Sequence, residues 1–184
     1  MKNLLIVLSG PSGVGKGTIV NKLIAKGGYA LSVSCTTRSP RSGEKDGREY
    51  FFISKDKFLK MIEGGGFLEY SNHFENFYGT PVEFVENKLK THNVLLEIDV
   101  DGGLQIKKSH PEALLIFIAP PSKKELKQRL VGRGTEDPEK IEKRLSRTEY
   151  ELSQAHKYDY TVINDDLNVA LSEIENIIKL KKEQ

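Results

Sequence analysis

The stretch Gly10-Pro11-Ser12-Gly13-Val14-Gly15-Lys16 constrains the fold of this chain more than any other. It directly follows the apolar run 4–8 and directly precedes a stretch of helical character at 18–26. Its glycines let successive backbone N–H groups point inward, and the N-terminus of the following helix adds a positive dipole end. We therefore predict a strand, a phosphate-cradling loop and a helix, with Lys16 reaching the outer phosphates. The alternative is a purely steric glycine turn beside an exposed lysine.

The residue after this lysine departs from the usual phosphate-loop pattern. That position normally carries a Ser or Thr whose hydroxyl touches Mg²⁺, but here it is Gly17, and the hydroxyl follows at Thr18. Mg²⁺ keeps several waters and commonly binds through substrate phosphates. We therefore expect Mg²⁺ to be held mainly by nucleotide phosphates and water.

Composition narrows the class of protein. The chain has 184 residues, of which 38% are hydrophobic and 29% charged, as expected for one globular unit with a full core. A net charge of +2 gives no reason to expect a nucleic-acid or membrane partner. The single Cys35 excludes an internal disulfide, and no apolar run has the length of a signal peptide core or a membrane span. These features predict a cytoplasmic protein. They do not distinguish a monomer from a homodimer.

The first half of the chain reads as a core unit followed by an insertion. After the first helix, 29–36 alternates as a strand and runs into a polar loop, and 50–53 is a second β-like run. Ser54 can cap a short helix that Gly64-Gly65-Gly66 must end, and 67–70 is again β-like. We therefore predict a β-rich insertion at 34–80.

The second half returns to the core. Thr80-Pro81-Val82-Glu83 and Ser122-Lys123-Lys124-Glu125 both read as capping boxes that start helices. The runs 94–98 and 114–118 are apolar except at Glu97, as in parallel strands covered on both faces. A last strand at 160–163 and an amphipathic helix from Leu167 follow. The fold class is therefore α/β, a parallel sheet wrapped by helices, with its core at 1–33, 81–124 and 151–184 and an arginine-bearing helical lid at 125–150.

Taken together, these motifs resemble the guanylate kinase family of nucleoside monophosphate kinases over essentially the whole chain. The most specific matches are Gly10-Pro11-Ser12-Gly13, the stretch 34–41 with its T-T-R-x-P-R core, Tyr78-Gly79-Thr80, Ile98-Asp99 and Arg133-Gly134-Thr135-Glu136. The resemblance implies a phosphate-loop kinase core, a GMP-binding lobe and a mobile lid. It also implies transfer of phosphate from ATP to GMP, and to dGMP, with Mg²⁺, in purine metabolism and GMP recycling.

The acceptor site follows from residue chemistry and from the resemblance. Arg38 and Arg41 can form a forked clamp on a phosphate, and the alternative is a pair of ordinary surface arginines. Guanine presents N1–H and N2–H side by side, which suits a carboxylate such as Glu69, unless that residue simply faces solvent. By resemblance the GMP-binding residues are Ser34, Arg38, Arg41, Tyr50, Glu69, Tyr78, Thr80 and Asp99.

The donor site is assigned in the same way. By resemblance ATP binds the loop residues Gly10, Pro11, Ser12, Gly13, Val14, Gly15, Lys16, Gly17 and Thr18, together with Arg129, Arg133 and Asn164. Lys16, Arg38, Arg133 and Arg144 are the expected catalytic residues, and Arg147 is a further candidate. Because a GMP phosphate oxygen is already ionised near neutral pH, positioning and charge neutralisation replace a general base. The alternative for the later arginines is an ordinary cationic helix face.

Two acidic residues leave their roles open. Asp99 follows a predicted strand, where it can lie near both substrates and near Mg²⁺. The alternative is that it simply caps the next helix. Thr18 can also lie near Mg²⁺. Asp101 stands where many relatives carry glutamine, and it adds a second carboxylate near Asp99.

Two other functions compete with this one. The first is a catalytically inactive guanylate-kinase-like module that binds a phosphorylated peptide, which would not need the phosphate loop or the lid arginines. The second is a kinase of another small phosphate acceptor, against which Glu69, Ser34 and Thr80 argue.

Overall fold

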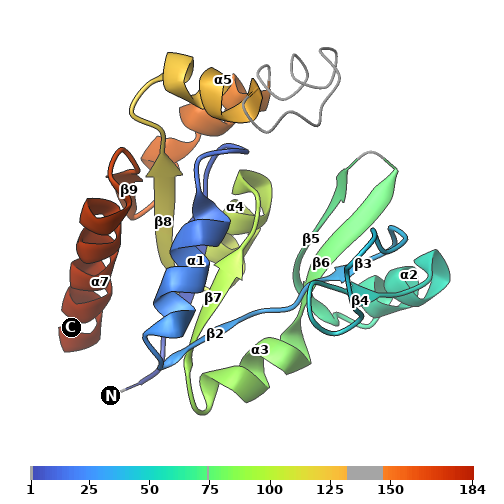
Figure 1. The fold of residues 1–184 in the computed structure, drawn as a ribbon. Coiled ribbons are helices and arrows are strands. Elements are labelled where there is room, and N and C mark those ends of the chain that lie inside the picture. Colours follow the sequence, from blue (N-terminus) through green and yellow to red (C-terminus); the bar gives the residue numbers. More distant parts are fainter. Residues whose placement is uncertain (1, 74, 132–146) are drawn as a thin grey trace.

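The computed structural model describes residues 2–73, 75–131 and 147–184 (Figure 1). Within these residues a five-stranded sheet has the order β2-β7-β1-β8-β9, and every neighbouring pair in it is parallel. Its strands are β1 (Leu5–Ser9), β2 (Tyr29–Leu31), β7 (Asn93–Glu97), β8 (Leu114–Ala119) and β9 (Tyr160–Ile163). The central position of β1 places the loop that follows it at the middle of one sheet edge.

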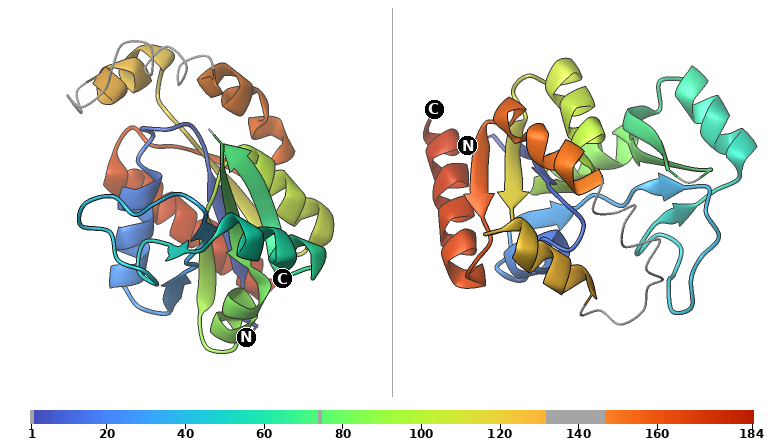
Figure 2. Two further views of the ribbon diagram at one scale, coloured as in Figure 1. Left: turned by 90° about the vertical axis from the view of Figure 1, so that its right-hand side faces the viewer. Right: turned by 90° about the horizontal axis from the view of Figure 1, so that it is seen from above.

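Helices cover both faces of this sheet, as the two views of Figure 2 show. On one face, Ile6 and Leu8 of β1 pack with α1 (Lys16–Ala25) and α7 (Leu167–Glu183). On the other face, Leu5 and Val7 pack with α3 (Val82–Leu89) and α4 (Val100–Ser109). Full burial of such side chains stabilises the fold by about 1.5–3 kcal/mol each. The continuous apolar runs in the sequence are explained by this two-sided burial, as predicted.

A second sheet, on the right in Figure 1, lies beside the first. Among the described residues it has four strands in the order β4-β3-β6-β5, with β3–β4 parallel and the other pairs antiparallel. Its elements are β3 (Cys35–Thr36), β4 (Phe51–Phe52), α2 (Lys55–Glu63), β5 (Phe67–His73) and β6 (Asn76–Pro81). The fully buried Phe58 of α2 stacks on Phe67 with 4.3 Å between ring centroids, which holds the helix on the sheet.

The prediction of a single strand at 29–36 is wrong. The structure divides it into β2 in the central sheet and β3 in the second sheet. The Ser32 N–H still bonds to Leu95 O, but Cys35 pairs with Phe51 and Gly79. An alternating pattern shows that residues are extended, but it does not say which sheet provides their partners.

The capping box predicted at 80–83 is also wrong. Thr80 belongs to β6, and α3 begins at Val82 after Pro81, with no side-chain cap. The Thr80 hydroxyl donates to the Glu69 carboxylate instead. The other two predicted caps are confirmed, because Ser54 Oγ accepts from Lys57 N–H and Ser122 Oγ accepts from Glu125 N–H.

Only the ends of the predicted lid lie in the described part of the chain. These are α5 (Lys123–Val131) and helical residues 147–153, which the short helix η1 (Ala155–Lys157) follows. Arg133 and Arg144 lie outside the described residues. Among the helices described, none is both long enough and apolar enough to cross a membrane.

Candidate active site

The loop between β1 and α1 has the backbone that a phosphate cradle requires. Gly10 and Gly15 have φ angles of 149° and 99°, which favour glycine. A Cβ at Gly10 would lie 2.2 Å from Ile118 O, so the loop packs directly on β8. Lys16 opens α1, and its Nζ donates to Gly10 O at 2.6 Å and to Pro11 O at 3.2 Å. The lysine therefore lies folded over its own loop, at the end of the helix that favours anions.

Two cavities adjoin this loop and share Ser12, Lys16 and Glu97 in their walls. One, of about 400 Å³, runs along the start of α1 past Gly17 and Thr18. The other, of about 340 Å³, extends toward the second sheet and is also lined by Gly10, Leu31, Ser32, Ser34, Glu49, Tyr50, Ile98, Asp99 and Glu151. Lys16 thus lies between a cavity on the loop side and a cavity on the side of the predicted acceptor site.

Three of the residues predicted to bind the base lie together. Glu69 is only 4% exposed, so it does not face solvent. Thr80 Oγ1 donates to Glu69 Oε1 at 2.6 Å, and Ser34 Oγ lies 3.5 Å from Thr80 Oγ1. Glu69 lies on β5 at an irregularity in its pairing with β6, and a Cβ at Gly102 of α4 would come within 2.7 Å of its Oε2. The carboxylate is therefore held from two sides in a largely buried position.

The structure brings together some of the residues predicted to hold the acceptor phosphate. The Arg38 guanidinium lies 5.5 Å from the Tyr50 ring centroid, and the Tyr50 and Tyr78 rings are 5.9 Å apart. Arg38 Nη1 and Nη2 both donate to Glu44, each at 2.9 Å, and this hydrogen bonding raises the pKa of Arg38. Arg41 is exposed, and its backbone N–H donates to the same carboxylate. Arg38, Tyr50 and Tyr78 are thus brought together.

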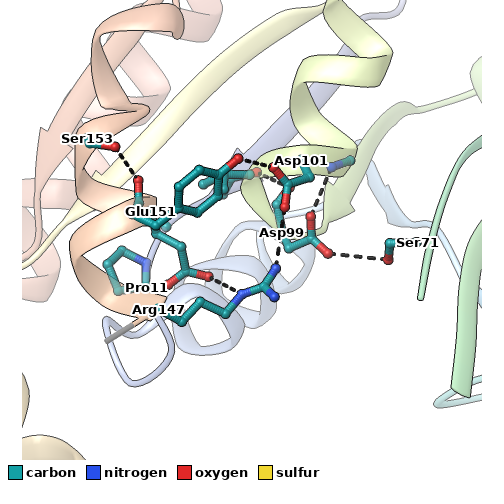
Figure 3. A network of polar contacts seen from close by, with 12 residues as sticks. Pro11, Ser71, Asp99, Asp101, Arg147, Glu151 and Ser153 are labelled. Atoms are coloured by element: carbon teal, nitrogen blue, oxygen red, sulfur yellow. Dashed lines mark hydrogen bonds and ion pairs between the residues drawn. The ribbon is translucent and has the colours of Figure 1, made fainter. Parts of the chain in front are cut away.

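Asp99 adopts the helix-capping role that the sequence left open. Its Oδ1 accepts from Gly102 N–H at 2.9 Å, and its Oδ2 accepts from Ser71 Oγ at 3.3 Å (Figure 3). Asp99 also lines the cavity beside Lys16. It therefore links the start of α4, strand β5 and the cavity.

Asp101 points toward helical residues 147–153 (Figure 3). Its Oδ1 accepts from the Tyr150 hydroxyl at 2.5 Å, and its Oδ2 lies 3.6 Å from Arg147 Nη2. Arg147 Nε also lies 3.4 Å from Oε1 of Glu151. The guanidinium of Arg147 therefore lies between a carboxylate of α4 and a carboxylate of its own helix.

Three carboxylates that line the cavities, Glu49, Glu97 and Glu151, were not among the predicted site residues. Partial desolvation raises the pKa of Glu97, and the Lys16 ammonium offsets part of this increase. Burial likewise raises the pKa of Glu151, against the lowering effect of Lys16 and Arg147. Glu97 carried a signal in the sequence, since it is the polar residue at the end of an apolar strand, where ligands bind in parallel sheets. Glu151 resembles any other helix glutamate, so no local pattern marks it.

Asn164, predicted to contact ATP, supports the loop from behind. Its side chain is buried, and Nδ2 donates to Val14 O at 2.8 Å. A Cβ at Gly15 would lie 2.5 Å from the same Nδ2, so the amide touches the loop closely. The side chain of Arg129, in α5, lies outside the described part of the chain, as do Arg133 and Arg144.

Asn164→Ala is expected to lower the free energy of unfolding by about 1–3 kcal/mol, because it leaves a buried carbonyl of the loop without this donor. ATP should also bind several-fold more weakly, because the loop is less well held. Thermal unfolding and titration calorimetry with ATP measure the two effects. Asn168→Ala, at an exposed position on α7, is the control. Unchanged stability together with unchanged ATP affinity would contradict the supporting role.

Comparison with known proteins identifies the family. The guanylate kinase family model matches residues 2–181. The chain is 52% identical over 183 residues to a guanylate kinase of Clostridioides difficile (strain 630), covering 98% of this chain and 89% of that protein. It is also 52% identical over 179 residues to a guanylate kinase of Prochlorococcus marinus (strain NATL2A), covering 96% of each.

Solved structures of other proteins support the same family. The crystal structure of guanylate kinase from Anaplasma phagocytophilum matches with a TM-score of 0.81 and 34% identity, over 100% of this chain and 88% of that one. Shikimate kinase from Bacteroides thetaiotaomicron matches with a TM-score of 0.56 and 13% identity, over 96% and 98% of the two chains, which shows a shared fold alone. From its sequence and its structure, the chain belongs to the guanylate kinase family and is a nucleoside monophosphate kinase.

Proposed function

We propose that this enzyme transfers the γ-phosphoryl group of ATP to GMP, giving ADP and GDP, and that it serves purine nucleotide metabolism and GMP recycling in the cytoplasm. The observation that carries the proposal is the buried carboxylate of Glu69, which accepts from the Thr80 hydroxyl. That hydroxyl lies 3.5 Å from Ser34 Oγ, and Ser34 lines the same cavity as Lys16. The segments 34–80 and 125–150 serve in this proposal as the GMP-binding lobe and the lid.

Glu69 accounts for a preference for guanine. A carboxylate has about four lone-pair positions, so Glu69 can accept from Thr80 and still accept from the N1–H and N2–H of guanine. Adenine has no such pair of donors on the corresponding edge, and it would leave the buried carboxylate without these partners. These contacts do not involve the ribose, so dGMP should be an acceptor as well.

Charge neutralisation and positioning drive the transfer. The loop N–H groups and Lys16 bind the ATP phosphates, while Arg38, Arg41, Tyr50 and Tyr78 hold the phosphate of GMP. Fixed donors of this kind stabilise charge that develops in the transition state without reorganising during the reaction. Arg129, Arg133, Arg144 and Arg147 are proposed to add positive charge from the lid.

The oxygen donors around the two cavities fit a magnesium ion. Thr18 lines one cavity, Asp99 lines the other, and Glu97 lines both. In the described part of the chain no group of three or more His, Cys, Asp or Glu side chains could hold a metal ion. A site with few protein ligands suits Mg²⁺, which retains waters and binds phosphates. When bound, the ion supplies further neutralisation of the phosphate charge.

A coupled assay of ADP formation tests this function. With ATP and Mg²⁺ as donor, GMP and dGMP should be phosphorylated, and AMP, CMP and UMP should react slower by orders of magnitude. Equal or faster reaction with AMP, CMP or UMP would overturn the assignment of GMP as the acceptor.

Gly102→Ala offers a test of the base site from the neighbouring helix. Alanine normally stabilises a helix interior by about 0.5–1 kcal/mol relative to glycine, but here the new Cβ would lie 2.7 Å from Glu69 Oε2 and 3.2 Å from Glu69 Cδ. The carboxylate must therefore shift, and we expect the KM for GMP to rise about tenfold or more, with the KM for ATP changed less. Steady-state kinetics with each substrate varied in turn measure this. An unchanged KM for GMP would show that the position of Glu69 is not critical.

A further inference from the structure

We propose that Glu44 is a positioning residue that fixes the guanidinium of Arg38 for the acceptor phosphate. The inference rests on the proposed function, in which Arg38 contacts the phosphate of GMP, and adds a residue that holds this contact in place. Glu44 follows Arg38 by six residues in the loop between β3 and β4.

The contact between Glu44 and Arg38 uses both ends of each group. Arg38 Nη1 donates to Glu44 Oε2 and Arg38 Nη2 donates to Glu44 Oε1, each at 2.9 Å. Such a two-point contact fixes the plane of the guanidinium as well as its position. Only 15% of the Arg38 side chain and 17% of the Glu44 side chain are exposed, so solvent screens this pair less than an ordinary surface pair.

The same carboxylate also closes the loop that carries both arginines. Glu44 Oε2 accepts from Arg41 N–H at 2.7 Å, and Glu44 N–H donates to Arg41 O at 3.1 Å. Arg38 Nη1 donates in addition to Ser39 O at 2.7 Å. Arg38 and Arg41 therefore start from one compact turn whose centre is the Glu44 side chain.

Aromatic rings fix the guanidinium from the side. The Cζ of Arg38 lies 5.5 Å from the ring centroid of Tyr50 and 5.8 Å from that of Phe52. A guanidinium has five N–H donors. The three bonds to Glu44 and Ser39, together with a hydrogen bond to the Tyr78 hydroxyl, still leave a donor for a phosphate oxygen. Because carboxylate, carbonyl and rings already order the side chain, GMP does not have to immobilise a long flexible arginine when it binds.

Glu44 has two opposing effects on a phosphate. Its negative charge repels the phosphate, whereas its contacts hold Arg38 ready to receive it. The hydrogen bonds from Arg38 and Arg41 lower the pKa of Glu44, so the carboxylate remains ionised and paired at neutral pH. Most of its charge is thus directed at the two arginines, and we infer that the positioning effect exceeds the repulsion.

The test compares GMP with guanosine, which has the same base and ribose and no phosphate. Dissociation constants are measured by calorimetry for the full chain, for Glu44→Ala and for Glu44→Asp, which keeps a carboxylate on a shorter side chain. We expect Glu44→Ala to weaken GMP binding about tenfold or more and guanosine binding less than about twofold, with Glu44→Asp in between. In turnover, Glu44→Ala should raise the KM for GMP more than the KM for ATP.

A matched control comes from the same loop. Asp46 Oδ1 accepts from Phe52 N–H at 2.8 Å, so Asp46→Ala also removes a bond that orders the loop, without removing a bond to either arginine. It should not discriminate between GMP and guanosine. Thermal unfolding checks that each variant is folded. If Glu44→Ala does not fold, the comparison of GMP with guanosine is made with Glu44→Asp.

Three results would overturn the inference. Tighter or unchanged GMP binding in Glu44→Ala would mean that Glu44 competes with the phosphate or has no effect. Equal weakening of GMP binding and guanosine binding in Glu44→Ala would assign Glu44 to the general stability of the lobe. Selective weakening of GMP binding in Asp46→Ala as well would lead to the same conclusion. A wild-type chain that fails to phosphorylate GMP would contradict the proposed function and not the role of Glu44. The binding experiment needs no ATP and no turnover, so it tests the role of Glu44 separately.

Discussion

Lys16→Met should lower kcat with ATP and GMP by about a hundredfold or more, a loss of about 2.7 kcal/mol in transition-state stabilisation. The ammonium group lies at the mouth of the phosphate loop, in the wall shared by both cavities. A fixed positive charge there opposes the negative charge on the transferring group, and the loop N–H groups alone do not supply a full charge. The expected loss is therefore in kcat as well as in kcat/KM.

The fold should survive this substitution. The Lys16 ammonium bonds to Gly10 O and Pro11 O, which lie in its own loop, and the removal of such bonds costs about 1 kcal/mol. Methionine keeps an unbranched apolar side chain of similar length on a helix. Circular dichroism and thermal unfolding should thus show a folded protein that scarcely turns over.

Lys22→Met is the matched control for Lys16→Met, because Lys22 lies on the same helix and is exposed. It should keep activity near that of the wild type. If Lys16→Met retained more than about a tenth of wild-type kcat, less than about 1.4 kcal/mol would be lost and the assignment of Lys16 would fail.

The central sheet could be predicted because its signals are local. A strand covered on both faces must be apolar at every position, so 94–96 and 114–118 were identifiable without knowledge of their partners. The phosphate loop is local too, since its glycines, its lysine and the start of α1 are consecutive. Ser54 and Ser122 were correctly predicted as caps because a capping hydroxyl and the backbone N–H that donates to it are three residues apart.

The contacts that shape the site could not be predicted, because they join residues far apart in the sequence. Thr80 has the pattern of a helix cap, but the carboxylate of Glu69 lies opposite it on the neighbouring strand and accepts its hydrogen bond. The hydrogen bond between Asp101 and Tyr150 joins residues that are 49 positions apart in the sequence. Glu44 lies close to Arg38 in sequence, but a loop has no periodicity that would indicate where its side chains point.

The comparisons also decide between the competing functions. A catalytically inactive module would need neither the phosphate loop nor Lys16, whereas this chain has both and is 52% identical to proteins named guanylate kinase. The nucleoside monophosphate kinase assignment therefore stands, and the choice of base becomes the next question for experiment.

Glu69→Gln should abolish most of the preference for GMP. The substitution replaces one carboxylate oxygen by an amide NH₂. The oxygen that remains can still accept from Thr80, so the NH₂ is a donor placed where the guanine N1–H and N2–H require acceptors. A buried donor that faces another donor costs about 1–3 kcal/mol, and two groups are affected when GMP binds. We therefore expect kcat/KM for GMP to fall by about a hundredfold or more, while kcat/KM for AMP changes little.

The measurement is the ratio of kcat/KM for GMP to that for AMP, in the wild type and in the variant. Glu63→Gln, an exposed position on α2 of the same lobe, should leave the ratio unchanged. Because glutamine has nearly the same size as glutamate, the position beside Gly102 remains filled, and the variant should unfold at a temperature close to that of the wild type. A ratio within about threefold of the wild-type value would place guanine recognition elsewhere, since a buried carboxylate that contacts the base cannot lose its charge without effect on selectivity.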